Sequence, residues 1–546
     1  MRVVLHGRRV GGWIVRITSS DQRSESELPV EKLSSLVSVS GMGVESHIVP
    51  LTQWMAETWW GSWRATLSSA SAPRVRERIV HSRKTQVSSH GQDPVSVATR
   101  ELLKKGSGLL VVPPAASALQ VVVELAARGP VLAVCPTQRM AVMGAGALRR
   151  RGLSVALAPD DWDLARAGVD VVIGARSSVL APCVDLGAIV VVDEHDELLH
   201  EERSPTWDAS SVAVKRAQDA GIPCVLTSPI PSLRSKNLFA HNIIEVASQP
   251  SWPRISVVDL ANIPVNASLL SSELLQSVQE KGKTTLCVLN TKGKARLVIC
   301  KSCKGVQKCS TCESLLEQDE AGEFFCKRCG ASHGSVCVEC GRSAFVVPRG
   351  GVSQLRTQLQ ASSVNPVIEI TGDSDDTWTQ GNVFIGTEAV LYRMNSADVV
   401  VFADIDRDLS APRLSASYEA LALIARAARM VSPNGHVVIQ TRQPTHPLLL
   451  ALGSGDVAAN VRSWANEQLG LFQSLSLPPF SVVARILLSD KRSLDELPEL
   501  DQVSVAREEN GALLRATNRE QMNLAIAQIR HTFGTDVRVH GEPRRF

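Results

Sequence analysis

Residues 108–135 read GLLVVPPAASALQVVVELAARGPVLAVC, and this stretch decides the fold class. Two short runs of mostly branched apolar residues, GLLVV and VLAV, stand on either side of the helix-like segment VVVELAARG. A continuous apolar run, a helix and a second apolar run are typical of a parallel sheet whose two faces are both covered by helices. The stretch therefore predicts an α/β fold with a parallel sheet.

The same alternation continues along the chain in two series. The first series covers residues 96–245 and goes on with VDVVIGA, GAIVVVDE and GIPCVLTS. The second covers residues 252–446 and contains RISVVDL, TTLCVLN, NPVIEITG, NVFIGTE, DVVVFADID and GHVVIQT. We therefore expect two parallel-sheet lobes, the second of them interrupted by a cysteine-rich segment.

Length and composition exclude several classes of protein. At roughly 150 residues per domain, 546 residues correspond to three or four domains. An apolar fraction of 44%, a charged fraction of 21% and a mean hydropathy of +0.03 are those of a globular protein, not of a disordered or collagen-like chain. No stretch approaches the ~18 unbroken apolar residues of a membrane span, and MRVVLHGRRVGGW has no long apolar secretion signal. We expect a cytoplasmic protein with no membrane partner.

The net charge of +3 is unevenly distributed along the chain. Residues 1–105 hold 15 Lys or Arg and 9 Asp or Glu, a charge of +6, so the rest of the chain carries −3. A basic N-terminal segment on a near-neutral body suits an anionic partner such as nucleic acid, with Arg8, Arg9 and Arg16 as candidate contacts. A solvated basic face that binds nothing is the alternative.

Eight of the twelve cysteines are concentrated in a short segment with the spacing C-x2-C-x5-C-x2-C-x13-C-x2-C-x7-C-x2-C. They are Cys300, Cys303, Cys309, Cys312, Cys326, Cys329, Cys337 and Cys340. Disulfides are rare in the reducing cytosol, and four C-x2-C pairs can supply two tetrahedral four-thiolate sites. We predict two structural zinc ions with no open coordination position; an iron–sulfur cluster or a redox dithiol is the alternative.

The spacing leaves open which C-x2-C pairs share a metal. The inner two pairs could bind one ion and the outer two the other, or pairs that follow each other in the chain could combine. Residues 297–345 hold six basic and six acidic side chains, so the segment is neutral. Because a neutral module is a poor phosphate-binding surface, we expect it to contact protein or to separate strands.

The segment between the first apolar run and its helix lacks the features of a phosphate-binding loop. It reads PPAASALQ from Pro113 to Gln120, with no glycine and no lysine. The prolines have no N–H group, whereas a phosphate loop holds its ligand through backbone N–H donors and a lysine. The loop therefore predicts that triphosphate does not bind in the usual way.

Acidic residues and arginines occur at two places where a nucleotide-dependent enzyme would use them. The run GAIVVVDEHDE follows a buried strand with acids that include Asp193 and Glu194, and such acids can hold magnesium. The segment IARAAR places Arg426 and Arg429 on one helix face, from which they could reach a phosphate across a cleft. The alternatives are a solvated strand end and an ordinary basic surface helix.

Several segments occur in the order known from one family. The segments are the cysteine segment 300–341 and the stretches GRRVGGWIV, VVIGARSSVLAP, IVVVDEHDELLHEERSPTW, TSPIPSL, VLNTKGKA, VFIGTEAV, VVVFADIDRDL, ARAAR and LPPFSVVARILL. They resemble motifs of the PriA family, the replication-restart helicases of superfamily 2. The resemblance covers nearly the whole chain, and the cysteine segment is its most specific part.

The resemblance implies two RecA-like lobes with a zinc-binding insertion in the second. Cys300, Cys303, Cys337 and Cys340 would bind one zinc ion, and Cys309, Cys312, Cys326 and Cys329 would bind the other. The implied partners are forked DNA, single-stranded DNA, primosome proteins and the proteins that load the replicative helicase. The implied role is to recognise abandoned replication forks and to help reload that helicase.

The chain departs from the family at the motifs that carry nucleotide chemistry. The family's G-x-x-x-x-G-K-T loop is replaced by a stretch with Ala118 at the lysine position. The D-E-E-H motif reads DEHD, the S-A-T motif reads SPI, and the Q-x-x-G-R-x-G-R helix keeps only its arginines. Because the phosphate cradle is missing, we predict no ATP hydrolysis and no DNA unwinding. Asp193, Glu194, Arg426 and Arg429 would then be degenerate remnants, with no catalytic or nucleotide-binding role.

Two departures concern the N-terminal part. The chain opens almost inside GRRVGGWIV. Either the true start lies upstream of Met1, or the family's domain for the three-prime end of a nascent strand is incomplete here. The segment between residues 65 and 95 is too short and too rich in serine for the family's winged-helix domain.

The expected organisation has five parts and a linker. These are a partial N-terminal DNA-binding-like domain at 1–64, a linker at 65–95, the first lobe at 96–246, the second lobe at 247–296 and 346–446, the zinc module at 297–345 and a C-terminal domain at 447–546. The predicted function is that of a non-catalytic fork-binding and primosome-assembly protein. An active ATP-dependent 3'-5' DNA helicase and a zinc-module scaffold without DNA binding are the alternatives.

Overall fold

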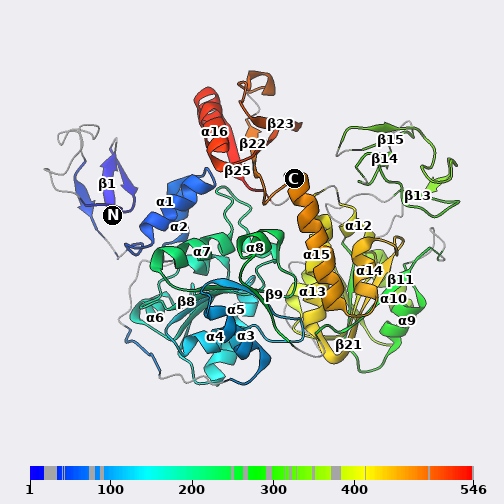
Figure 1. Cartoon of the computed structure of the whole chain (residues 1–546), viewed down its shortest axis with the longest axis horizontal. Helices are drawn as coiled ribbons and strands as arrows, with labels where there is room; N and C mark the ends of the chain where they lie inside the picture. The colour runs from blue at the N-terminus through cyan, green and yellow to red at the C-terminus, as the bar shows by residue number, and fades with distance from the viewer. Residues whose placement is uncertain are drawn as a thin grey trace.

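A computed structural model describes residues 1–5, 7–17, 34–39, 41, 43–72, 80–85, 91–247, 251–261, 263, 269–290, 298–312, 314–318, 322–326, 329–346, 351–370, 383–411, 413–489, 492–508 and 510–543. Two α/β lobes form the body of the molecule, and smaller units lie around them (Figure 1). Of the sequence motifs quoted above, most of VLNTKGKA lies outside the described residues.

The first lobe is built on a seven-stranded parallel sheet in the order β10-β4-β9-β8-β5-β7-β6. Its strands are β4 (Gly108–Val111), β5 (Val131–Val134), β6 (Val155–Ala158), β7 (Val171–Gly174), β8 (Ala188–Val191), β9 (Cys224–Ser228) and β10 (Ile243–Glu245). Its helices are α3 (Pro94–Leu103), α4 (Leu119–Ala126), α5 (Gln138–Arg150), α6 (Trp162–Ala167), α7 (Ala209–Ala220) and α8 (Leu233–Leu238). Successive strand residues enter opposite cores: Leu109 lies in one and Leu110 in the other. Continuous apolar runs are needed because both faces are buried.

The second lobe repeats this architecture with a six-stranded parallel sheet in the order β11-β21-β20-β12-β19-β18. The strands are β11 (Arg254–Asp259), β12 (Thr285–Val288), β18 (Val367–Ile370), β19 (Val383–Gly386), β20 (Ala397–Phe402) and β21 (Val431–Thr441). The helices are α9 (Ser272–Gln279), α10 (Val352–Ser362), α11 (Ala389–Arg393), α12 (Asp406–Leu409) and α13 (Ala416–Met430). The predicted α/β class with two parallel-sheet lobes is confirmed.

The cysteine-rich module is an insertion between β12 and α10, as the sequence predicted. Its strands are the two-residue pieces β13 (Ile299–Cys300), β14 (Glu317–Gln318), β15 (Phe324–Phe325), β16 (Ser332–His333) and β17 (Phe345–Val346). Its two apolar clusters are small, one around Ile299 and one around Phe324. Apolar cores of this size contribute little to folding stability. Modules of this kind are usually stabilised by disulfides or bound metal ions as well.

The C-terminal part contains two different kinds of structure. Helices α14 (Pro447–Gly453) and α15 (Val457–Ser474) lie within the predicted C-terminal domain, but Leu448 and Trp464 pack into the core of the second lobe. A separate antiparallel sheet follows, in the order β23-β24-β22-β25. It consists of β22 (Val482–Leu488), β23 (Val503–Glu508), β24 (Gly511–Ala516) and β25 (Val537–Gly541), with α16 (Arg519–Phe533) on one face.

The N-terminal part likewise contains a separate small sheet and helices that pack on the body of the molecule. Strands β1 (Arg2–Leu5), β2 (Arg8–Gly11) and β3 (Leu36–Ser38) form a small sheet that stands away from the lobes (Figure 1). Helices α1 (Val49–Thr58) and α2 (Trp63–Ser69) follow. Met55 and Trp59 are buried in the first lobe's core, whereas Trp60 enters the core of the C-terminal sheet. The tryptophan-rich run therefore joins two parts of the molecule, and α2 continues into the predicted linker.

None of the helices in the described ranges has both the length and the apolar character needed to cross a membrane.

Candidate functional site

An acidic turn follows β8 at the carboxyl edge of the first sheet. Asp193 has a positive φ of 51°, which lets the chain turn sharply and which aspartate tolerates better than branched residues do. Asp193, Glu194 and Asp196 are only 5%, 2% and 5% exposed. The alternative of a solvated strand end is therefore wrong for this turn.

Two serines at the start of α8, the N-cap Ser232 and Ser235 of the first turn, hold Glu194. The Ser232 backbone N–H donates to Glu194 Oε1 at 2.7 Å, and the Ser232 and Ser235 hydroxyls donate to Oε2 at 2.8 and 2.6 Å. Burial raises the pKa of Glu194, and these hydrogen bonds oppose the shift. Glu194 thus connects two loops of the same lobe.

Helix α13 of the second lobe brings Arg429 to this turn. Arg429 Nη2 donates to Asp193 Oδ1 at 2.8 Å, and Nη1 donates to the carbonyl of Ala116 at 3.1 Å. The Arg429 guanidinium therefore lies between the loop that precedes α4 and the acid that follows β8. In nucleotide-dependent enzymes of this architecture, phosphate and magnesium occupy that position.

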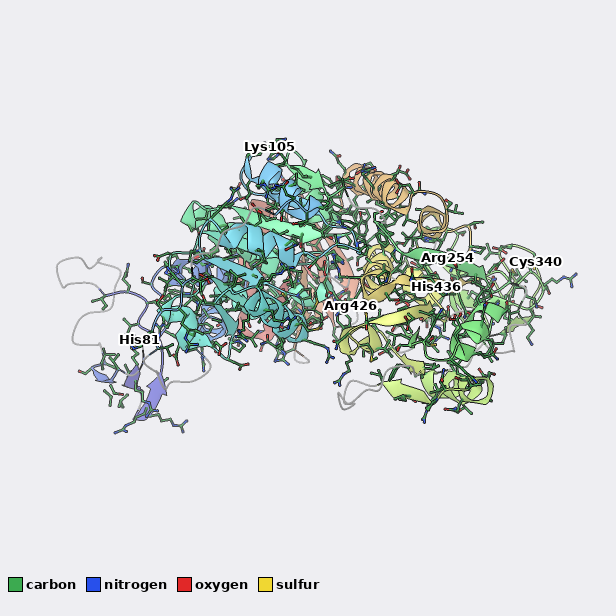
Figure 2. The ribbon with its side chains drawn as sticks, turned by 90° about the horizontal axis from the view of Figure 1, so that it is seen from below. His81, Lys105, Arg254, Cys340, Arg426 and His436 are labelled. Carbon is green, nitrogen blue, oxygen red and sulfur yellow. The ribbon has the colours of Figure 1, made fainter. Side chains whose placement is uncertain are left out.

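Arg426 makes a second contact across the lobes, one helical turn earlier on α13. Its Nη1 lies 3.4 Å from Asp196 Oδ2, and its guanidinium carbon lies 3.8 Å from the ring centre of Tyr392. The Tyr392 hydroxyl is 3.5 Å from both Asp196 oxygens. Burial raises the pKa of Asp196 to about 6, although Arg426 opposes the shift. Figure 2 shows Arg426 where the elements of the two lobes meet.

The two arginines are thus not those of an ordinary surface helix. Their side chains are 13% and 21% exposed and each is paired with an acid of the other lobe. The structure brings together all four residues interpreted as remnants, which are Asp193, Glu194, Arg426 and Arg429. Sequence reasoning missed Ala116 and Tyr392, because a carbonyl acceptor carries no sequence signature and a lone tyrosine carries little.

Three positions of the loop before α4 offer no free N–H donor. Pro113 and Pro114 have no N–H, and the N–H of Ala116 bonds to the carbonyl of Pro113 at 2.9 Å. Helix α4 starts after Ala118 with no side-chain cap. The loop therefore presents a carbonyl to Arg429 where a phosphate loop presents N–H groups.

A cavity of about 690 Å³ opens beside the acidic turn, between the two lobes, α1 and the C-terminal sheet. Its lining includes seven carboxylates but only three Lys or Arg side chains. The carboxylates belong to Glu194, Asp196, Glu197, Asp208, Glu388, Glu419 and Glu542, and the cations to Lys215, Arg234 and Arg519. An acidic lining repels phosphate, so this cavity is a poor alternative nucleotide site.

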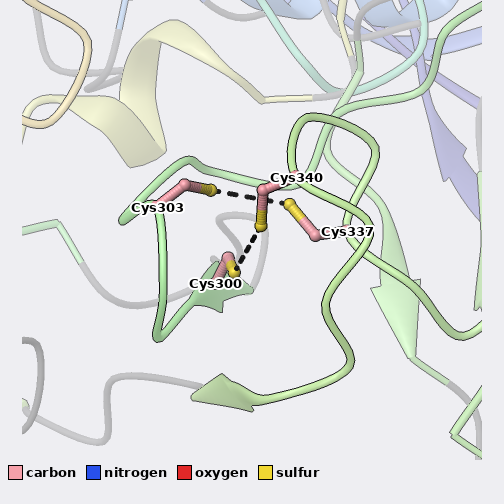
Figure 3. A group of neighbouring side chains, drawn as sticks. All are labelled: Cys300, Cys303, Cys337 and Cys340. Carbon is pink, nitrogen blue, oxygen red and sulfur yellow. Dashed lines mark hydrogen bonds between the residues drawn. The ribbon is translucent and has the colours of Figure 1, made fainter.

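The cysteine-rich module contains two groups of four thiols that could hold metal ions. Cys300, Cys303, Cys337 and Cys340 form one group (Figure 3), and Cys309, Cys312, Cys326 and Cys329 form the other. Within each group all four sulfur atoms lie within 4.8 Å of one another. The outer two C-x2-C pairs thus combine, and so do the inner two; the alternative in which consecutive pairs combine is wrong.

The spacing of the sulfur atoms fits a tetrahedral ion. Sγ–Sγ distances are 3.6 Å for Cys300–Cys340 and 3.4 Å for Cys312–Cys326. Four sulfurs about 2.3 Å from a central ion would lie about 3.8 Å apart, and a disulfide would require about 2 Å. The geometry therefore matches closed four-thiolate sites.

Neighbouring donors support the thiolate form of Cys300, Cys309 and Cys337. The backbone N–H groups of Ser302 and Thr311 each lie 3.4 Å from a sulfur, that of Cys300 and that of Cys309 respectively. Gln307 Nε2 donates to Cys337 Sγ at 3.3 Å, and His333 Nε2 lies 3.2 Å from Cys309 Sγ. Such bonds orient metal ligands and lower the charge on sulfur. Gln307 and His333 carried no sequence signal, because they lie outside the C-x2-C pattern.

The predicted DNA contacts lie elsewhere. Arg8 and Arg9 are exposed on β2, in the sheet that stands away from the lobes, and Arg16 is exposed in the segment that follows β2. The structure therefore does not bring them to the interface that contains Arg426 and Arg429.

Comparison with known proteins gives a consistent set of relatives. No protein-family model matches the chain. Replication restart protein PriA of Haemophilus influenzae is 29% identical over 368 residues, 61% of this chain and 49% of that protein. PriA of Bacillus subtilis is 26% identical over 63% of this chain and 46% of its own length, and PriA of Treponema pallidum is 28% identical over 59% and 52%. The matched region spans about half the length of these relatives.

Solved structures give a weaker likeness. The Escherichia coli DExH-box NTPase HrpB aligns with a TM-score of 0.36 at 11% identity, over 65% of this chain and 42% of that one. The helicase MrfA bound to DNA aligns with the same TM-score and identity, over 85% and 65%. Likeness at this level carries no conclusion about activity. The sequence comparison is more informative: over about 60% of its length, this chain is similar to the replication restart proteins of the PriA family.

Proposed function

We propose that this chain is a replication restart protein that binds forked and single-stranded DNA and helps to assemble the primosome, without hydrolysing ATP. The similarity to PriA proteins supports the restart role. One observation carries the non-catalytic part: Arg429 is bonded both to Asp193 and to the Ala116 carbonyl. A nucleotide would have to displace these contacts and would find no lysine in the loop and no N–H group on Pro113 and Pro114.

The DNA contacts are proposed at two places. The first is the N-terminal sheet, where Arg8, Arg9 and Arg16 are exposed and no acid occurs between residues 1 and 17. The second is a cavity of about 560 Å³ at the carboxyl edge of the first sheet. Thr137, the N-cap of α5, and Ser177 line it, and hydroxyls of this kind can bind phosphate oxygens.

The two four-thiolate groups are proposed to hold zinc, one ion each. Soft thiolates select zinc or an iron–sulfur cluster, and a closed tetrahedral set leaves no position for substrate. Zinc would supply no chemistry beyond holding the small module folded. The module's neutral charge supports a protein-contact role for it, with primosome or helicase-loading proteins as the partners. We also propose a cytoplasmic location. We propose the domain boundaries expected from the sequence, except that α14 and α15 belong with the second lobe, because they pack into its core.

One preparation of the full chain can test the function. We expect two zinc ions per chain by mass spectrometry, binding of forked DNA that weakens steeply with salt, and no ATP turnover above the buffer background. ATP turnover that forked DNA stimulates and that Asp193→Ala abolishes would support the active-helicase alternative instead. Absence of fork binding at low salt would support the scaffold alternative.

A further inference from the structure

The two lobes are bridged by protein groups where a nucleotide would otherwise bridge them. Arg429 lies 2.8 Å from Asp193, and Arg426 lies 3.4 Å from Asp196. In nucleotide-dependent relatives of this architecture, magnesium and phosphate stand between such acids and arginines. Here the arginines reach the acids directly, so closing the lobes needs no ligand.

Burial makes these pairs specific for one arrangement. The side chains of Asp193 and Asp196 are 7% and 6% exposed. A shift of one lobe that kept the acids buried but moved the arginines would leave buried charges without partners, which is strongly unfavourable. The pairs therefore favour one position of α13 against the first lobe.

Apolar packing acts together with the ion pairs. Ile230 belongs to the loop after β9 in the first lobe, yet it is 3% exposed and packs in the core of the second lobe. This side chain would have to leave that core if the lobes separated, which opposes separation because buried apolar area would be exposed to water.

Further polar contacts cross between the lobes at other elements. Arg139 Nε on α5 donates to Asn395 Oδ1 at 3.1 Å. Arg462 on α15 pairs with Glu245 on β10. Contacts at several separate places restrict rotation as well as separation.

We propose that these contacts, above all Arg429–Asp193 and Arg426–Asp196, hold the lobes in one closed arrangement that nucleotide neither produces nor releases. A motor of this fold works by opening and closing between steps. This protein instead keeps a constant arrangement, so the groups at the carboxyl edges of its sheets stay in fixed positions. The inference concerns the lobes alone and stands whether or not DNA binds.

The distance between the lobes tests the proposal in the full chain. Spin labels on non-natural residues at Lys105 and Gln276, which are exposed on different lobes, avoid the cysteines. Figure 2 shows Lys105 at the outer side of the first lobe. We expect one narrow distance distribution by electron double resonance, unchanged by a magnesium–ATP analogue. A broad distribution, or one that shifts with the analogue, would overturn the proposal.

Charge changes at the interface test the cause. Asp193→Arg places two cations together and should at least double the width of the distribution, and adding Arg429→Asp should restore the narrow one. Asp219→Arg is the matched control, because Asp219 pairs only with Lys215 of the same helix among the ion pairs the structure describes; it should leave the width unchanged. A narrow distribution in Asp193→Arg contradicts the proposal.

A second variant covers the case in which the charge swap does not fold. Arg429→Met removes the charge and both N–H contacts while keeping much of the apolar side chain. We expect it to retain the native circular dichroism spectrum and to widen the distance distribution at least twofold. A folded Arg429→Met protein with the wild-type width would overturn the proposal.

Discussion

The guanidinium of Arg429 lies 2.8 Å from the carboxylate of Asp193, although 236 positions separate the two residues in the chain. The same guanidinium donates to the carbonyl of Ala116. One side chain of the second lobe is thus bonded to the two places in the first lobe that would hold magnesium and phosphate in an ATPase. In the closed arrangement proposed above, Arg429 and Arg426 hold the two lobes together through these contacts.

Removal of the carboxylate of Asp193 should destabilise the protein. Asp193→Asn leaves the charge of Arg429 with neutral partners only. Breaking a fully buried pair in this way costs about 3–5 kcal/mol, and we expect about 2 kcal/mol because the Arg429 side chain is 21% exposed. The midpoint of urea unfolding measures the effect. Asp219→Asn removes only an exposed pair with Lys215 and should stay within about 0.5 kcal/mol; equal effects in both variants would contradict the prediction.

Stability should depend on pH through Asp196. Burial raises the pKa of its carboxyl from 3.8 to about 6. Because the folded state then binds the proton more tightly than the unfolded state, this contribution is fully present below about pH 4 and is lost as the pH rises through about 6. Asp196→Asn removes it. The thermal midpoint of the wild type minus that of the variant should therefore fall as the pH rises from about 4 to above 6. A difference that stays flat or rises with pH would contradict this prediction.

Substitution of one thiol should release one metal ion and no more. Cys300→Ser and Cys309→Ser each disrupt one of the two groups, so native mass spectrometry should find one ion fewer than in the wild type. The exposed Lys301 should become a site of rapid trypsin cleavage in Cys300→Ser, because metal binding and folding are coupled in such small modules. Cys183→Ser, a buried thiol outside both groups, is the control and should keep every ion.

Restoration of the missing lysine should not restore ATP hydrolysis. In Ala118→Lys the loop still contains Pro113 and Pro114, which have no N–H, and Arg429 still bonds to the Ala116 carbonyl. A lysine alone does not supply the N–H donors that the two prolines lack, and it does not remove Arg429 from the loop. We expect no turnover above background in a coupled assay with forked DNA. Measurable turnover would show that the loop can still cradle a triphosphate.

Removal of the N-terminal arginines should weaken DNA binding and reduce its dependence on salt. Each phosphate that a cation neutralises on single-stranded DNA contributes about 0.7 to the slope of log K against log salt. The double change Arg8→Ala and Arg9→Ala should therefore make the dependence shallower, reducing the magnitude of the slope by about 1.4 in fluorescence anisotropy titrations. The double change Lys105→Ala and Lys281→Ala removes two exposed cations elsewhere and should leave the slope unchanged.

Much of the fold follows from local pattern. The run GAIVVV had to be a buried strand, since its residues fill both faces of a sheet, and Val190 and Val191 enter different cores. The boundaries of the packing units were less predictable. Met55 and Trp464 lie in segments expected to form terminal domains, but they pack into the lobes. An apolar helix face shows that it will be buried, but not which core will bury it.

The amino-acid sequence by itself determined the two parallel sheets, the inserted module and the eight thiols, because buried runs and C-x2-C turns are features of neighbouring residues. Only the tertiary structure decided that Arg429 faces Asp193 and Ala116 and that Tyr392 stacks on Arg426. It also placed Cys300 beside Cys340, a grouping that the cysteine spacing left open and the family resemblance implied. These contacts depend on how segments far apart in the chain are placed against each other. Burial strengthens the ion pairs among these contacts, since charges within a few ångströms interact strongly only where water is excluded.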